Sequence, residues 1–357
     1  MILRAYFLKT LTLALGVILT IVLFRNTEFW YNFYTDFAFP HLSYSLRLIS
    51  NIVDFSIGDI LYIFLILYIL RGLFRLIRSK GYLFSYQLVF AMRFASISAL
   101  IFYALWGFNY FIPSLSSRLD LEENTYDKKT LFIELEKQIF TINSLHESLE
   151  NNRDSTVTFK MTNQEIIQSL NSAYLSTSED LELPMYRRRS VKPSILSTPL
   201  SYSGFSGYLN PFTQEAQYNY NSPKSSLPHT IAHEIAHQLG IAPENEANFV
   251  GLVACLNSSA LELQYSARLT LFAHTYSQLA QTNDPELKDY LSKLRPGILK
   301  EFTKRSAVWE YYKNPLEPYL KKGYDQYLKS NKQISGIKSY SEFIGLWLAY
   351  QNKTNIS

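Results

Sequence analysis

The sequence predicts a mostly α-helical membrane protein, with three N-terminal transmembrane helices followed by an α+β domain outside the membrane. The chain of 357 residues is 47% hydrophobic, yet its mean hydropathy is only -0.05. This balance indicates a membrane part joined to a water-exposed part. Long apolar stretches are confined to the first third of the chain and are long enough to cross a bilayer: residues 8–24, 57–77 and 94–112. We therefore expect a membrane domain over residues 1–113 and a second domain over 114–357.

Basic residues are distributed unevenly between the two links that join these spans. The second link has no acidic residue and contains Arg71, Arg75, Arg78, Lys80 and Arg93. The first link carries Arg47 against Glu28, Asp36 and Asp54. Links rich in Lys and Arg stay in the cytoplasm. We therefore expect the N-terminus and the second link in the cytoplasm, and the chain after Pro113 on the outer side.

Part of the first link, residues 38–55, has apolar side chains at helical spacing, namely Leu42, Leu46, Ile49 and Ile52 or Val53. Two structures fit this pattern equally well. One is an amphipathic helix lying at the outer membrane interface. The other is an ordinary helix packed within a loop.

After Leu119 the composition changes to helical patterns of mixed polarity, on which His146 is expected to face solvent. Residues 183–223 are then rich in Ser, Pro, Gly and Tyr, which predicts a small β-hairpin or sheet. Within it, residues 211–221 fit either an edge strand that pairs with an extended peptide or a purely structural hairpin. Beyond residue 227 the pattern is helical almost to the end of the chain.

The stretch "HTIAHEIAHQLG", residues 229–240, is the strongest chemical signal in the chain. Pro228 suits the first turn of a helix and Gly240 its end. His233 and His237 are four residues apart, so their imidazoles project from one face and can bind one metal ion. Glu234 lies beside this pair, where a general base would take a proton from water. The alternative is a helix that carries two incidental histidines.

A catalytic zinc needs a third protein ligand. Cys255 is the only cysteine, which excludes a disulfide framework and a Cys-rich zinc ribbon. The next segment offers Glu244 and Glu246, which point to nearly opposite faces of a helix. Asn248 follows Glu244 by one turn, where it can hydrogen-bond a ligand imidazole. We therefore favour Glu244 as the third ligand, with Glu246 as the alternative.

A hydrolase also needs hydrogen-bond donors for the oxyanion that develops on the substrate. The candidates are Tyr265, His274, Tyr276 and Tyr340. Tyr340 has a small advantage, because the C-terminal stretch must pack back onto the domain. His229 lies one turn before His233 and is expected at the start of the helix near the cleft.

Two resemblances add to these expectations. "HEIAHQLG" resembles the zincin helix, and Glu244-x-x-x-Asn248 is similar to the Glu-x-x-x-Asp element of gluzincin metallopeptidases. In that group the Glu binds zinc and the Asp steadies a ligand histidine. The resemblance therefore implies a zincin-like domain, Zn²⁺ as cofactor, and Asn248 in support of a ligand. This chain differs from the group in its short spacing after His237 and in having Asn for Asp.

The whole chain also resembles an uncharacterised family of bacterial membrane proteins with three N-terminal spans and an HExxH domain. The matching segments are "FSIGDILY", "KPSILSTPLSYSGFSGYLNPFTQEA", "HEIAHQLGIAPENEANF" and "YDQYLKSNKQISGIKSY". This resemblance implies a zinc peptidase in the bacterial inner membrane and identifies no substrate.

These observations predict a membrane-anchored zinc hydrolase, most simply a metallopeptidase, whose general base is Glu234. Its expected partners are the lipid bilayer and a peptide or protein substrate, with no nucleic acid. The alternative is a non-enzymatic membrane-tethered scaffold or sensor with a structural or vestigial zinc site. The presence of Glu234 favours the enzyme, because a structural site does not need a base.

Overall fold

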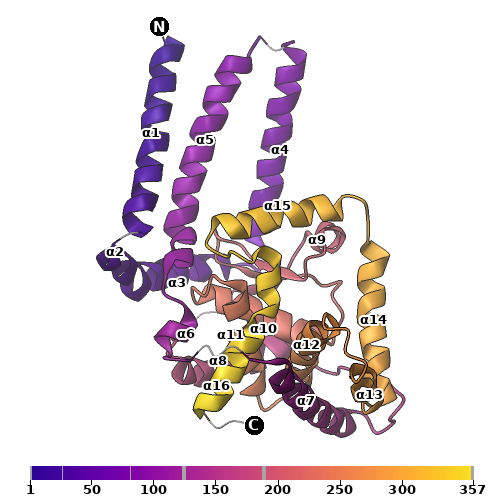
Figure 1. Cartoon of the computed structure of the whole chain (residues 1–357). Helices are drawn as coiled ribbons and strands as arrows, with labels where there is room; N and C mark the ends of the chain where they lie inside the picture. Colours follow the sequence, from indigo (N-terminus) through magenta and orange to yellow (C-terminus); the bar gives the residue numbers. More distant parts are fainter. Residues whose placement is uncertain (1, 26, 81, 123–125, 187–189, 355–357) are drawn as a thin grey trace.

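Three long apolar helices stand side by side at one end of the protein in the computed structural model (Figure 1). They are α1 (Ile2–Arg25), α4 (Ile57–Arg78) and α5 (Phe84–Leu105). The structure describes residues 2–25, 27–80, 82–122, 126–186 and 190–354. By length and composition, the candidate membrane spans are Arg4–Phe24, Ile57–Arg78 and Phe84–Leu105. The N-terminus and the α4–α5 link lie together, far from the globular part (Figure 1).

The third of these helices differs from the expected range of 94–112. The expected range began after Arg93 so that the span would contain no charge. In the structure α5 begins at Phe84 and includes Arg93. The Arg93 guanidinium lies 5.0 Å from the centroid of the Tyr6 ring on α1, so the charge has an aromatic partner. Beyond Leu105 the helix stops at Trp106, and Gly107–Phe111 forms the 3₁₀ helix η2. These last apolar residues pack inside the protein.

The first link forms α2 (Glu28–Phe33), the π-helical turn η1 (Tyr34–Ala38) and α3 (Phe39–Ser50). The buried face of α3 is largely polar, because Ser43, Arg47 and Ser50 are buried. Arg47 Nη1 donates to the carbonyl of Gln238 at 2.7 Å. The apolar residues Leu42, Leu48 and Ile49 are exposed instead. These apolar side chains are therefore left uncovered on α3, while its polar side chains contact the globular part.

The globular part is mostly helical and surrounds α10 (Leu227–Gln238), all of whose residues are buried. Its other helices are α6 (Leu115–Arg118), α7 (Lys128–Leu149), α8 (Asn163–Asp180), α9 (Ser197–Ser203), α11 (Glu244–Leu256), α12 (Leu261–Ala280), α13 (Leu287–Ser292), α14 (Pro296–Tyr312), α15 (Glu317–Ser330), the 3₁₀ helix η3 (Gly336–Ser341) and α16 (Phe343–Thr354). The expectation for His146 was wrong. This residue is buried on α7, and its Nε2 lies 3.0 Å from the carbonyl oxygen of Ser155.

A three-stranded sheet lies beside α10, in the order β1 (Val191–Pro193), β3 (Ala216–Tyr218), β2 (Gly207–Leu209). β2 and β3 form the expected antiparallel hairpin, and β1 adds a parallel strand. β3 is paired on both sides and fully buried, so it has no free edge for a peptide. Residues 211–221 therefore fit the structural hairpin better than a peptide-binding edge strand. Among the described strands, β2 is the edge that lies next to α10.

A buried polar junction joins α4 to this sheet. The Glu215 carboxylate accepts hydrogen bonds from the backbone N–H groups of Ile57 and Gly58, at the positive end of the α4 dipole. Lys192 Nζ lies 2.9 Å from the same carboxylate, and both side chains are buried. Asp59 accepts from Ser194 Oγ at 3.0 Å. The second span is therefore fixed to the sheet that borders α10.

Candidate metal centre

The three residues of the HExxH motif come together on α10. Candidate ligand atoms of His233, Glu234 and His237 lie within 4.8 Å of one another, and all three side chains are buried. The helical repeat explains this local arrangement, because residues four apart share a face. Pro228 lies in the first turn of α10, as the sequence predicted.

The next helix brings a third side chain to the same point. Glu244 is the first residue of α11, and its Oε2 lies 3.1 Å from His233 Nε2 and 3.5 Å from His237 Nε2. The two imidazole Nε2 atoms are 3.1 Å apart. Among the described residues, the buried Glu244 Oε2 has no hydrogen-bond partner of acceptable geometry. Such an oxygen next to two imidazole nitrogens is a typical metal-ligand environment.

The size of this triangle fits a zinc ion. Tetrahedral zinc with ligand bonds of about 2.0–2.1 Å places its ligand atoms about 3.3–3.4 Å apart. The three distances here are 3.1, 3.1 and 3.5 Å. The donor set of two imidazoles and one carboxylate also matches that of catalytic zinc sites with three protein ligands. His233, His237 and Glu244 are therefore the residues that could hold the ion.

Both imidazoles are oriented by hydrogen bonds at their other ring nitrogen. His233 Nδ1 lies 2.9 Å from Asn248 Oδ1, and His237 Nδ1 lies 2.6 Å from the carbonyl oxygen of Ile241. Both acceptors require a proton on Nδ1, which leaves the Nε2 lone pairs free for a metal. Asn248 Nδ2 in turn donates to the carbonyl of Tyr340 at 3.0 Å, which holds its oxygen toward His233.

Glu246, the alternative ligand, has a different role in the structure. Its Oε1 accepts a hydrogen bond from the backbone N–H of Leu115 at 2.9 Å. This interaction ties α11 to α6 on the side away from the histidines. The geometry therefore favours Glu244, for the reason that the sequence suggested: Glu244 and Asn248 share one face of α11.

Glu234 is buried beside the triangle of His233, His237 and Glu244. Among the described residues, its buried Oε2 has no hydrogen-bond partner. Burial raises the pKa of Glu234 to about 7, against the opposing effect of the two histidines. β2 passes directly over this carboxylate, since a Cβ on Gly207 would lie 2.7 Å from Glu234 Oε1. Glycine at this position therefore leaves room for the Glu234 carboxylate.

Two tyrosines close the site from the C-terminal part of the chain. Tyr324 on α15 donates to Glu244 Oε1 at 2.7 Å, and its hydroxyl lies 3.3 Å from that of Tyr340. The Tyr340 ring stacks on His233 with centroids 6.0 Å apart. Burial and the Glu244 charge raise the pKa of both phenols well above the usual value, so both remain hydrogen-bond donors. Tyr340 was a sequence candidate, whereas Tyr324 was missed.

The other candidate donors lie elsewhere. Tyr265 packs against Phe159 in the core of the globular part, and Tyr276 packs against Phe272. The His274 ring contacts Phe343. His229 is buried one turn from His233, and its Nε2 lies 3.3 Å from the carbonyl oxygen of Asn248 rather than in the triangle.

A second missed contact comes from the membrane side. Trp106, the residue after α5, lies edge-on to His237 with ring centroids 5.8 Å apart. It belongs to a cluster of buried apolar residues that links the span ends to the α10–α11 loop, namely Phe24, Tyr34, Phe39, Trp106, Phe108, Tyr110 and Ala242. The candidate metal centre therefore lies directly against the membrane part.

Charge is balanced within the triangle. Although burial alone would raise the pKa of Glu244, the two histidines hold it well below its usual range. Burial opposes protonation of His237, but the Glu244 carboxylate outweighs it and raises the pKa of His237 to about 9. Without a metal, a proton on His237 would therefore neutralise Glu244 at neutral pH. Metal binding would displace this proton.

The family model described as "Protein of unknown function (DUF3810)" matches residues 34–348, and the chain belongs to this family. No curated protein and no solved structure matches the chain.

Proposed function

We propose that this member of a family of unknown function is a membrane-anchored zinc metallopeptidase. The observation that carries the proposal is the triangle of His233, His237 and Glu244, beside the unpartnered carboxylate of Glu234. The two histidines and Glu244 would hold zinc. When bound, zinc supplies a Lewis acid that polarises the scissile carbonyl and lowers the pKa of water.

The remaining steps belong to the side chains of this chain. Glu234, whose buried carboxylate lies beside the triangle, takes a proton from the attacking water and later passes it to the leaving amine. The phenol of Tyr340 donates to the oxygen that becomes negative in the transition state. Tyr324 holds Glu244 in place. The edge strand β2, which runs over Glu234, supports binding of an extended peptide by strand addition.

The alternative function is a scaffold or sensor with a structural zinc site. A structural site is usually closed by four protein ligands. Among the described residues, three side chains form the ligand set. Next to them lies the buried carboxylate of Glu234, one oxygen of which has no hydrogen-bond partner. This arrangement favours catalysis.

Glu234→Gln separates the two functions. The substitution keeps the shape of the side chain but removes the base, so zinc content should stay at about one per chain. Peptide hydrolysis should fall by roughly 10²–10⁴-fold. His233→Ala is the matched variant that should lose both zinc and activity. Metal analysis of the full-length protein and digestion of a peptide library measure both properties. Full turnover by the Gln variant would refute the role of Glu234 as the base, and a zinc-loaded unmodified protein that cleaves no peptide would favour the scaffold or sensor.

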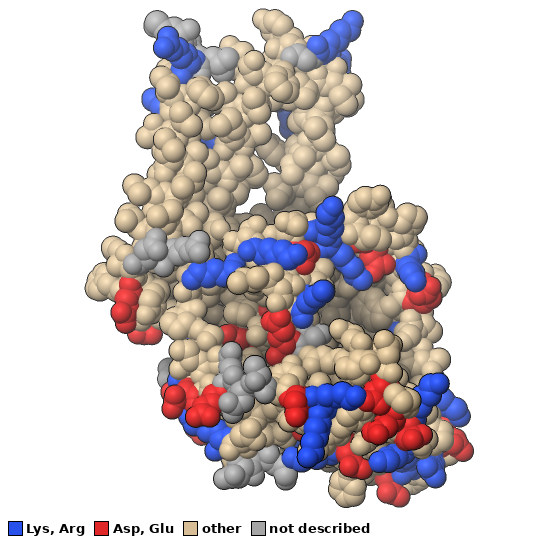
Figure 2. All heavy atoms as spheres, in the orientation of Figure 1, with Lys and Arg blue, Asp and Glu red and all other residues tan. Residues whose placement is uncertain are grey.

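We also propose that the site faces away from the cytoplasm of a bacterial inner membrane. The three apolar helices support membrane insertion. Lysine and arginine side chains gather at the helix ends far from the globular part (Figure 2), as the positive-inside rule requires for a cytoplasmic end.

A reporter fusion tests this orientation. Alkaline phosphatase, which folds only outside the cytoplasm, should be active when fused after residue 120 and inactive when fused after Arg78. The opposite pair of results would place the metal centre in the cytoplasm.

A further inference from the structure

A cavity of about 900 Å³ opens between the three membrane helices, at the end far from the globular part. Its walls come from Tyr6 of α1, from side chains between residues 68 and 76 of α4, and from side chains between residues 83 and 94 just before and within the first half of α5. Most of these side chains are apolar or aromatic, including Phe90 and Phe94. The volume is in the range of small-molecule binding sites.

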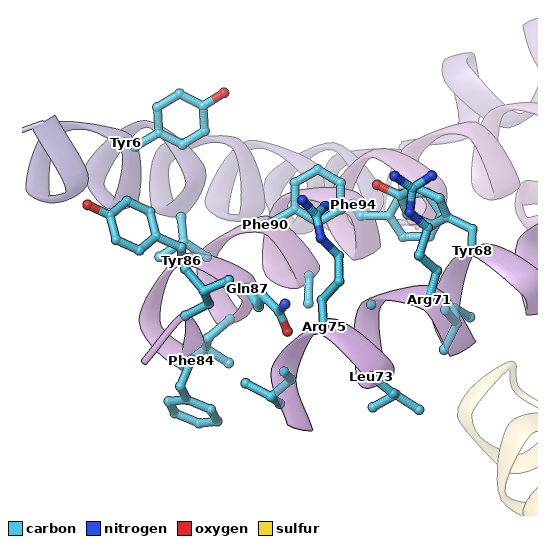
Figure 3. Close-up of a pocket in the computed structure, with 17 residues that line it drawn as sticks. Tyr6, Tyr68, Arg71, Leu73, Arg75, Phe84, Tyr86, Gln87, Phe90 and Phe94 are labelled. Atoms are coloured by element: carbon cyan, nitrogen blue, oxygen red, sulfur yellow. The ribbon is translucent and has the colours of Figure 1, made fainter. Parts of the chain in front are cut away.

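Two arginines place positive charge in this apolar cavity. Arg71 and Arg75 are one turn apart on α4, and both line it. Figure 3 shows their side chains reaching from α4 toward Phe90 and Phe94. No acidic residue is among the described residues that line the cavity, and neither arginine side chain has a hydrogen bond or ion pair within the described parts of the chain.

The depth of Arg71 within α4 favours a ligand. Arg71 is seven residues from the end of α4 at Arg78, which is about 10 Å along the helix. A charged side chain at this depth of a span is costly and is normally paired. Arg93 illustrates this in the same bundle, because it is paired with the Tyr6 ring.

We propose that this cavity binds one anionic phospholipid, with its phosphate between Arg71 and Arg75 and its acyl chains along the apolar wall. The arginines match a phosphate, which guanidinium groups bind in bidentate fashion. The apolar lining matches acyl chains and would contribute nothing to the binding of a soluble phosphate. A lipid can enter sideways, since the space lies between helices that cross the bilayer.

The test is lipid binding by the full-length protein in detergent, followed by native mass spectrometry. Phosphatidylglycerol should bind with a stoichiometry of one. Phosphatidylcholine and soluble glycerol phosphate should bind at least about tenfold more weakly. The double variant Arg71→Gln/Arg75→Gln should lose about tenfold or more in affinity for phosphatidylglycerol. Arg78→Gln removes a charge from the same helix outside the cavity and should bind like the unmodified protein.

A second variant keeps every charge. Gly72 lines the cavity, and a Cβ at this position meets nothing within 4 Å, so Gly72→Leu should fill space without a clash. It should weaken phosphatidylglycerol binding, whereas Gly16→Leu on α1, which is equally open but outside the cavity, should not. If Arg78→Gln lost as much affinity for phosphatidylglycerol as the double variant, the binding would be a general attraction to basic residues, and the proposal would be overturned. Full binding by Gly72→Leu, or equal binding of glycerol phosphate, would overturn it as well.

Discussion

At the scale of single residues, the candidate metal centre combines local and distant contributions. His233, Glu234 and His237 follow from one helical turn, and Glu244 and Asn248 from the next helix. The sequence could predict these residues because each pair is set by helical geometry. Tyr324 is 80 positions from Glu244, and it is only one of 27 tyrosines. Nothing in its local sequence distinguishes it from the others.

The two tyrosines are expected to act differently when their hydroxyls are removed. Tyr324→Phe removes the hydrogen bond to Glu244, and loss of such a partner typically lowers metal affinity by about 10–100-fold. Tyr340→Phe leaves that bond intact. If Tyr340 stabilises the oxyanion, the rate should fall by about 10²–10³-fold at saturating zinc. Zinc titration and kcat measurements on both variants give the comparison.

Tyr202→Phe is a suitable control, because this exposed tyrosine packs against Tyr312 away from the centre. It should change neither property. If Tyr340→Phe loses zinc affinity while its rate at saturating zinc is unchanged, the role assigned to its hydroxyl is wrong.

At the scale of elements, the centre depends on how closely α11 approaches α10. Gly251 on α11 makes this approach possible, since a Cβ there would lie 2.9 Å from the backbone nitrogen of His233. Backbone cannot move aside as a flexible side chain can. The distance between Glu244 and the histidines is therefore set partly by a glycine two turns further along α11.

Gly251→Ala should separate the two helices and weaken zinc binding. Overpacking of this kind costs about 1–3 kcal/mol of stability, and the ligand triangle should widen. We expect a lower thermal midpoint and at least about tenfold weaker zinc affinity. Gly323→Ala on α15 is the matched control. A Cβ there meets nothing within 4 Å, so it should leave both unchanged or raise stability slightly. Unchanged zinc affinity in Gly251→Ala would contradict this dependence.

The elements also show where sequence patterns fail. Hydropathy predicted three apolar helices, but placed the third at 94–112, because it cannot distinguish a residue facing lipid from Trp106 or Phe108 in a protein core. Spacing predicted the amphipathic link, but could not show that Ser43 and Arg47 are its buried face. In both cases the sequence pattern does not show what a helix surface packs against, because that depends on tertiary contacts.

At the scale of the whole molecule, the membrane part and the globular part share one interface. α3 binds the end of α10 through Arg47, α4 is fixed to the sheet through Glu215, and Trp106 contacts His237. The family match begins at residue 34, before α3, and so includes these contacts. The division at residue 113, which composition suggested, therefore passes through the surroundings of the candidate metal centre.

This interface predicts that residues 114–357 do not form a working centre alone. Removal of residues 1–113 would expose Ala242 and leave the buried carboxylate of Glu215 without the α4 N–H groups that it accepts from. Lys192 would still pair with Glu215, but the packing of the apolar cluster around Ala242 and the hydrogen bond from Arg47 to the end of α10 would be lost together. Losses of a few kcal/mol are a large part of the stability of a domain. The truncated protein should aggregate or bind zinc weakly. The full chain in detergent should hold about one zinc.

Co-expression of 1–113 with 114–357 as separate chains distinguishes a missing interface from simple misfolding. The two pieces should copurify through a tag on either one, and the complex should regain zinc. Arg47→Ala combined with Glu215→Gln in the co-expressed pair should reduce copurification, because each substitution removes a bond across the interface. A monomeric 114–357 with full zinc affinity would instead show that the spans only anchor an independent domain. The contact between Trp106 and His237 would then have no part in forming the centre.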